Sequence, residues 1–231
     1  VLTALLALNV SSEILNAFKT VNNSLVTSND QTTTSTEAVF KSLTAKLTDP
    51  QTMDKAKIWH PVAKDIKDYA SKVNTAIEGY KKELMLAADG KKDNPAEGYK
   101  IDNLDAATRV FVKNKKGQEL LKALTEFRDN VLKRDSAIGN AFANSLPINL
   151  EVPKSTTGAK KKSWEESYFH MVPTIAALTI LSKFQNDVKV TENKVVTFCH
   201  EKVGQVEVIQ DAFAAIAVAD ANYVLPGQDI N

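Results

Sequence analysis

The segment WHPVAKDIKDYASKVNTAIEGYKKELMLA, residues 59–87, carries the clearest pattern in the sequence. Apolar residues recur in it at steps of three and four for about four heptads, which is typical of helices that pack nearly parallel to one another. Pro61 falls close to the expected start of the helix, where a proline is best tolerated. The segment therefore predicts one long helix of a bundle. Its core-facing positions are Trp59, Val62, Ile66, Tyr69, Val73, Ala76, Tyr80, Leu84 and Ala87.

The composition agrees with a mainly helical globular protein. Of the 231 residues, 43% are hydrophobic and 25% are charged, which excludes a disordered chain. Only eight glycines and seven prolines are present, fewer than the turns of an all-β protein would need. Lys and Arg total 29 against 28 Asp and Glu, which argues against a nucleic-acid partner. The lone Cys199 excludes an internal disulfide and a cysteine-cluster zinc site.

Helical periodicity also precedes this segment. A stripe between residues 14 and 25 keeps steps of three and four, which predicts a helix that runs on without a break from the apolar start of the chain. The polar run SNDQTTTST, residues 28–36, predicts a turn. A short helix with Val39, Phe40, Leu43 and Leu47 on one face is expected next, ending at residues 48–54. The stripe consists of Ile14, Ala17, Phe18, Val21 and Leu25.

The second half of the chain is less regular. Residues 99–117 are expected to be irregular or a short helix, with Asn103 as a candidate cap. The helical period returns from Gln118 to Phe142. Residues 145–162 then form a loop of about eighteen residues, which is long for a compact domain.

Ser163 and Glu166 have the spacing of a capping box, which predicts the start of the last helical stretch. Unbroken to about Gly204, that helix would measure about 60 Å at 1.5 Å per residue. Pro173 is expected to kink it, and Asn186 followed by an aspartate offers a second joint. The part after Asn186 has fewer apolar positions, so we expect it to protrude or to pack on a second copy.

The two ends of the chain differ from the middle. Residues 1–10, VLTALLALNV, contain eight apolar residues, about half of the 20 that a membrane span needs. This segment is either the outer half of a transmembrane helix or an ordinary buried helix end. Near the other end, FAAIAVAD at residues 213–220 and the Pro-Gly turn signal after it predict the first strands of a β-domain that continues further.

No arrangement of residues predicts catalysis or metal binding. The sequence lacks nucleophile-elbow, zinc-protease and phosphate-loop motifs. Cys199 and His200 are neighbours that would point about 100° apart on a helix, so they do not form a dyad, and Cys199 is expected in the core. Glu166 and His170 predict a helix-surface pair, and His60 a surface residue of the first helical turn.

Several longer blocks resemble the GldM/PorM family of the type IX secretion and gliding machinery of Bacteroidota. They are LALNVSSEILNAFKTVNNSL at residues 6–25, SWEESYFHMVPTIAALTILSKFQNDVKVTENKVV at residues 163–196, and the shorter GYKIDNLDAATRVFV and NYVLPGQD. The resemblance implies a single inner-membrane helix, a periplasmic helical bundle and β-sandwich domains. It also implies that two copies sit inside a proton-driven ring of GldL/PorL subunits and transmit force towards a GldK/GldN-type (PorK/PorN) ring.

Together these observations predict a mainly α fold, an up-down helical bundle with long helices. It would be preceded by the end of a transmembrane helix and followed by the first strands of a truncated β-sandwich domain. Residues 1–28 would be the membrane helix end and periplasmic exit helix, 29–206 the periplasmic bundle, and 207–231 the start of the β-sandwich. The expected function is a non-enzymatic, inner-membrane-anchored motor subunit without cofactors. The alternative is a soluble extracytoplasmic adaptor that binds a partner with its bundle.

Two sets of contact residues are predicted for the motor subunit. The first set would lie in the bilayer against membrane helices of the GldL-like ring, and consists of Leu2, Leu5, Leu6 and Leu8. The second set would join two copies near the membrane exit, because an isolated helix leaving a bilayer has nothing else against which to bury an apolar stripe. It consists of Val10, Ile14, Ala17 and Val21.

Overall fold

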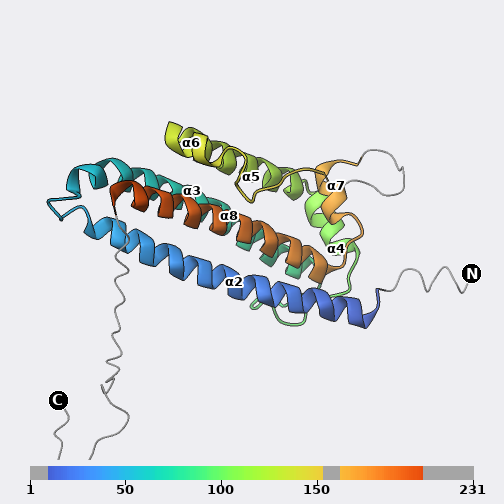
Figure 1. Ribbon diagram of the computed structural model, residues 1–231. Coiled ribbons are helices and arrows are strands. Elements are labelled where there is room, and N and C mark those ends of the chain that lie inside the picture. The colour runs from blue at the N-terminus through green and yellow to red at the C-terminus, as the bar shows by residue number, and fades with distance from the viewer. Residues whose placement is uncertain (1–9, 153–161, 205–231) are drawn as a thin grey trace, which may run out of the picture.

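A computed structural model describes residues 10–152 and 162–204, and every regular element in them is a helix (Figure 1). The mainly helical bundle is therefore confirmed. The predicted membrane segment and the predicted β-strands lie outside the described residues. The elements are α2 (Ser12–Ala45), α3 (Met53–Ala87), α4 (Asp105–Ala107), a π-helix η1 (Thr108–Lys113), α5 (Lys116–Lys133), α6 (Ser136–Phe142), α7 (Trp164–Phe169) and α8 (Thr174–Val203).

Three of the long helices point the same way and α3 points the other way (Figure 1). Along α2 and α8 the paired residues rise together, from Phe18 with Thr179 to Ser35 with Asn193, so these two helices are parallel. The contacts of α3 with α5 and α8 run in opposite directions: Tyr80 with Glu119, Asp65 with Arg134, Lys81 with Gln185, and Lys67 with Glu192. The predicted up-down alternation thus holds for α2, α3 and α5 and fails for α8, because the chain returns along the bundle between α6 and α7.

Helix α8 is the centre of the bundle, packed between α2 and α3 (Figure 1). Its second half does not protrude, contrary to the prediction from its sequence. Val188, Val195, Val196 and Cys199 are all fully buried there. The polar residues between them face polar residues of α2, so low hydrophobicity in this stretch does not indicate exposure.

Helix α2 is continuous through residues 28–36, so the predicted turn is wrong. The hydroxyls of Thr32, Thr33 and Thr36 donate to backbone carbonyl oxygens four residues earlier, over 2.8–2.9 Å. Such bonds satisfy within the helix the side chains that otherwise favour turns. Asn29 and Thr36 are buried against α8, and this packing outweighs the low helix propensity of the segment.

The beginning of α2 also differs from the prediction. Ser11 has an extended backbone and its Oγ accepts a hydrogen bond from the Ile14 N–H, so it is the N-cap. A helix that runs without a break through Val10 into α2 is therefore wrong. The apolar residues that face the bundle here are Leu15 and the half-buried Phe18, while Ile14 and Val21 point outward.

Helix α3 begins earlier than its sequence suggested. It starts at Met53, which places Pro61 inside the helix on the exposed side rather than near its start. His60 is likewise no first-turn surface residue. Its ring stacks on Phe40 of α2 with centroids 5.0 Å apart, and its Nε2 lies 3.1 Å from the Thr44 hydroxyl.

The end of the bundle where α8 begins is closed by the short helices. Asn103 Oδ1 accepts from the backbone N–H groups of Asp105 and Ala106, as expected of a cap. In the π-helix, Phe111 stacks on Phe169 of α7 with centroids 4.1 Å apart. The capping box of α7 is confirmed, but residues 170–173 separate α7 from α8, so the predicted single rod from residue 163 to 204 is wrong.

Candidate functional site

The predicted contact residues fall into two groups. Leu2, Leu5, Leu6 and Leu8 lie outside the described residues. Ile14, Ala17 and Val21 lie along one outer side of α2, whereas Val10 precedes the helix and packs against the core. We call these four residues the outer stripe. Ile14 and Val21 are each 50% exposed, and Val10 is half-buried. The described part of the chain leaves Ile14, Ala17 and Val21 exposed, and the use of the stripe as a dimer interface stays a prediction.

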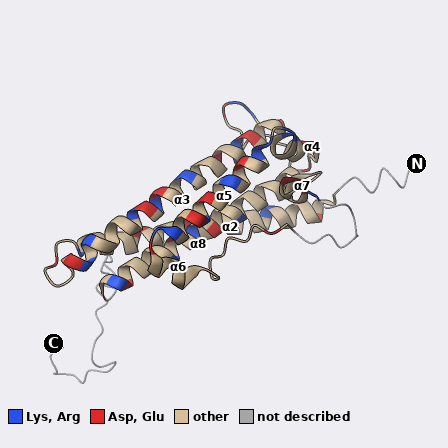
Figure 2. Cartoon of the chain, turned by 90° about the horizontal axis from the view of Figure 1, so that it is seen from above, with Lys and Arg blue, Asp and Glu red and all other residues tan. Residues whose placement is uncertain are grey.

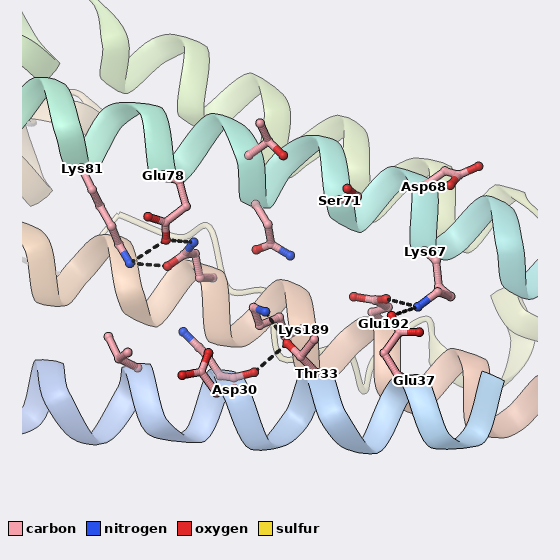
Figure 3. A pocket seen from close by; sticks show the side chains of 15 residues that line it. Asp30, Thr33, Glu37, Lys67, Asp68, Ser71, Glu78, Lys81, Lys189 and Glu192 are labelled. Atoms are coloured by element: carbon pink, nitrogen blue, oxygen red, sulfur yellow. Dashed lines mark hydrogen bonds and ion pairs between the residues drawn. The ribbon is translucent and has the colours of Figure 1, made fainter. Parts of the chain in front are cut away.

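A groove of about 570 Å³ separates α2 from α3 along the middle of the bundle, with α8 as its floor (Figure 3). Its charged lining has two more acids than bases, so it does not suit an anion such as a phosphate. The acids are Asp30, Glu37, Asp68, Glu78 and Glu192, and the bases are Lys67, Lys81 and Lys189.

The lysines of the groove are paired within the bundle. Lys81 is nearly buried, and its Nζ contacts Gln185 Oε1 and lies 3.3 Å from Glu78 Oε1. Burial lowers the pKa of Lys81, and the adjacent Glu78 opposes that shift. Gln185 in turn donates from Nε2 to Glu78 Oε1 over 2.7 Å. These three groups form a closed set that ties α3 to α8.

A second ion-pair set joins all three helices at the other end of the groove (Figure 3). Lys67 of α3 lies 2.5 Å from Glu37 of α2 and 3.6 Å from Glu192 of α8. Burial raises the pKa of Glu192, while the positive charge of Lys67 acts against this. The buried charges are thus compensated within the chain, and the groove presents no free reactive group with a catalytic partner.

The contact between α2 and α8 is lined with hydrogen-bonding side chains, and we call it the polar seam. Its α2 side consists of Asn22, Ser28, Asn29, Thr33, Ser35, Thr36 and Ser42, and its α8 side of Thr179, Ser182, Asn186, Lys189, Asn193 and His200.

The hydrogen bonds of the seam occur at successive levels along both helices. Thr179 Oγ1 donates to the Phe18 carbonyl oxygen over 3.2 Å, and Ser182 Oγ to Asn22 Oδ1 over 2.8 Å. Further along, Asn186 Nδ2 donates to Asn29 Oδ1 over 2.9 Å. Lys189 contacts Thr33, Asn193 donates to Ser35 and Thr36, and His200 Nε2 lies 2.9 Å from Ser42 Oγ at the far end. The seam therefore spans α2 almost from end to end.

Sequence reasoning missed this seam because it searched helices for apolar stripes. A signal was nevertheless present, since Asn22, Asn29, Thr36 and Leu43 are spaced seven residues apart. A heptad spacing places such residues on one side of a helix, whatever their polarity.

Cys199 and His200 do not form a catalytic pair. Both are fully buried, and the His200 ring is directed to Ser42. Burial raises the pKa of the Cys199 thiol to about 12, which leaves it protonated and unreactive. Glu166 serves the capping box, where its carboxylate accepts from the Ser163 N–H, and His170 is exposed beyond the helix end. Within the described residues, no three His, Cys, Asp or Glu side chains gather as a metal site.

Charged residues of both signs occur on the described helices. Figure 2 shows Lys and Arg interspersed with Asp and Glu along the helices. None of the helices in the described ranges, residues 10–152 and 162–204, is long and apolar enough to cross a membrane.

The described residues thus form an elongated helical bundle, with a groove whose lysines are paired within the chain and an exposed apolar stripe near the start of α2. The family model described as GldM N-terminal domain matches residues 13–201, nearly the whole extent from α2 to α8. The chain belongs to this family, whose members are components of the gliding and type IX secretion machinery. No curated protein matches the sequence.

Proposed function

We propose that this chain forms part of a non-enzymatic, inner-membrane-anchored periplasmic subunit of the type IX secretion and gliding motor. It would couple the proton-driven motion of a GldL-like membrane ring to a GldK/GldN-like ring on the outer-membrane side. The observation that carries the proposal is the family match over residues 13–201. The bundle adds a geometric reason, because the chain enters it at Ser12 and leaves it at Val203, at opposite ends (Figure 1).

The proposed subunit works as a homodimer, with the outer stripe of each copy facing the other near the membrane. Leu2, Leu5, Leu6 and Leu8 would contact membrane helices of the ring. An exposed apolar stripe at the entry end of the bundle supports this arrangement, since a helix surface of this kind is stabilised when it is covered.

An insertion can separate motion transfer from folding. Two glycines placed after Asn193 would not do this, because they would rotate the buried residues Val195, Val196 and Cys199 away from the core. Insertion of a flexible Gly-Ser segment after Gly204 leaves the bundle intact and loosens only its exit. We expect a normal protein level, normal binding to the membrane ring, and loss of secretion and gliding.

The matched control carries the same insertion after Asp93, in the exposed loop that follows α3. That loop belongs to neither α2 nor α8, the helices through which the chain enters and leaves the bundle. The insertion should therefore not affect the transfer of force, and the control should keep secretion. Wild-type secretion in the variant with the insertion after Gly204 would overturn the proposal.

The adaptor alternative is favoured by one observation, the groove between α2 and α3. An adaptor that holds a soluble partner there needs no stable anchor. Fractionation of cells that express the full-length protein discriminates the two functions, because a motor subunit stays with the inner membrane and the adaptor is released with the soluble periplasm.

A further inference from the structure

The helix that receives the chain and the helix that releases it lie side by side and parallel. The chain enters α2 at Ser12, and it leaves α8 at Val203, at the opposite end of the bundle (Figure 1). At 1.5 Å per residue, each of these helices is about 45–50 Å long. A pull applied at Ser12 and Val203 moves α2 and α8 in opposite directions along their shared axis direction, so the two helices are forced to slide past each other.

In this geometry the whole contact between the two helices resists the pull together. A pull at the same end of both helices would instead separate the contacts one after another. The direction of the load therefore decides how many contacts resist at once. Because α2 and α8 are parallel, a load applied at Ser12 and Val203 acts in the direction in which all the contacts resist together.

Helix α2 depends on α8 for most of its attachment. The groove keeps it away from α3 in the middle of the bundle (Figure 3). Contacts of α2 with α3 are found in its last third, where Glu37 meets Lys67 and where Phe40 and Thr44 meet His60. A pull on α2 at Ser12 must therefore pass to α8 across the polar seam.

The chemistry of the seam fixes one register between the two helices. Within α2, the buried apolar residues are Leu15 and Leu43, near its two ends, whereas Asn29 and Thr36 are buried between them. Apolar contacts are non-directional, and a slide of one turn can replace them with similar ones. Hydrogen bonds are lost once the partners move beyond about 3.5 Å or turn away, so the seam opposes even small slides.

We propose that the polar seam between α2 and α8 is a shear joint that passes axial load from the entry of the bundle to its exit in one fixed register. The inference rests on the proposed function only for the direction of the load in the cell. The mechanical property itself belongs to the isolated protein and can be measured without the motor.

Single-molecule force spectroscopy of the full chain tests the direction dependence. Handles attached through S12C and E201C load the seam in shear, whereas handles at S12C and M171C separate the same two helices from one end. Positions 12, 171 and 201 are exposed, and native Cys199 is buried and stays unlabelled. We expect slower unfolding in the shear direction at equal force. Equal unfolding rates in both directions would overturn the proposal.

A double substitution tests the role of the hydrogen bonds. Asn29→Leu with Asn186→Leu replaces a bonded pair by apolar side chains of similar size, a change that can be nearly neutral for equilibrium stability. We expect a similar denaturation midpoint and shear unfolding that is faster by about fivefold per hydrogen bond removed, the rate equivalent of roughly 1 kcal/mol. Asn23→Leu, on the exposed side of α2, is the control and should unfold at the wild-type rate.

If the double variant does not fold, Asn193→Ala carries the same test. This half-buried amide donates to Ser35 and Thr36, and its removal leaves no buried cavity of comparable size. If the folded variants unfold under shear load at the wild-type rate, the proposal of a shear joint is overturned. The two proposals can fail separately. If unfolding depends on the direction of pulling but the insertion after Gly204 leaves secretion intact, the proposed function is refuted and the shear joint is still supported.

Discussion

Asn29 in the middle of α2 donates a hydrogen bond from Nδ2 to the backbone carbonyl oxygen of Ser182 on α8, over 3.2 Å, although 153 residues separate the two in the sequence. Its Oδ1 accepts from Asn186 Nδ2 over 2.9 Å, so both ends of the buried amide are paired across the seam. An amide satisfied in this way specifies its neighbour more narrowly than an apolar side chain of the same size.

The Asn29→Ala substitution is expected to destabilise the bundle by about 1–3 kcal/mol, because it removes two hydrogen bonds across the seam at a buried position, one to the Ser182 carbonyl oxygen and one from the Asn186 amide. Urea unfolding followed by circular dichroism measures the change. Asn23→Ala, exposed on the same helix, is the control and should stay within about 0.5 kcal/mol of wild type. Equal effects of the two substitutions would show that the seam does not contribute to stability.

Ile14→Lys together with Val21→Lys is expected to weaken self-association, because two charges would then lie on the stripe that is predicted to face a second copy. Sedimentation of the purified protein gives the mass. Both side chains are half exposed in the single chain, so the fold should tolerate the change. Asn23→Lys with Thr27→Lys places the same charges on another exposed side of α2 as a control. A dimer of unchanged mass after the first pair of substitutions would place the interface elsewhere.

His200 should make the bundle sensitive to acid. Burial lowers the pKa of His200, and the nearby positive charge of Lys46 adds to this, against a smaller opposite effect of Glu201. In the unfolded chain the ring titrates near its ordinary value of about 6.5. As the pH falls below that value the unfolded state takes up the proton first, so the free energy of unfolding decreases until the folded pKa is passed.

Urea unfolding at two pH values, above and below the ordinary histidine pKa, measures this loss. His200→Gln should reduce the loss but not abolish it, because burial also lowers the pKa of His60. His170→Gln, at an exposed position, is the control for the substitution itself and should stay within about 0.5 kcal/mol of wild type at the higher pH. An unchanged pH dependence in His200→Gln would assign the acid sensitivity to other groups.

The Cys199 thiol should resist alkylation in the folded protein. It is fully buried, and burial raises its pKa to about 12, so almost no thiolate is present at neutral pH. Iodoacetamide labelling followed by mass spectrometry should modify it only when denaturant is added. The control Ser71→Cys introduces a thiol at an exposed position of α3, which should be labelled at once. Rapid native labelling of Cys199 would mean that the C-terminal end of α8 opens readily.

The sequence predicts the helices of this protein better than it predicts their arrangement. Steps of three and four identified α3 and α5, because apolar contacts with regular spacing dominate both. The same reasoning wrongly predicts a turn within α2, at residues 28–36. A helix segment that is buried through amides and hydroxyls has the composition of a turn when only local propensity is considered.

The direction of α8 was beyond local reasoning for a different reason. A chain return between α6 and α7 leaves no periodic signal, so nothing near residues 174–203 indicates a parallel neighbour. The outer stripe, in contrast, could be predicted from local sequence. Ile14 and Val21 were identified as an apolar stripe from their spacing alone, and their exposure in the fold is what keeps them candidates for an interface.

The position of α8 as the last helix of the bundle also sets the order in which the protein can assemble. Helix α2 emerges first during synthesis or export, yet its main partner arrives some 160 residues later, as the pair of Thr179 with Phe18 illustrates. Contacts so distant in sequence form late and slow the folding of a chain. A helix that waited with an apolar surface would be prone to aggregate. The amides and hydroxyls of α2 can remain hydrated during this delay, so the middle of α2 exposes less apolar surface before α8 arrives than a fully apolar contact face would.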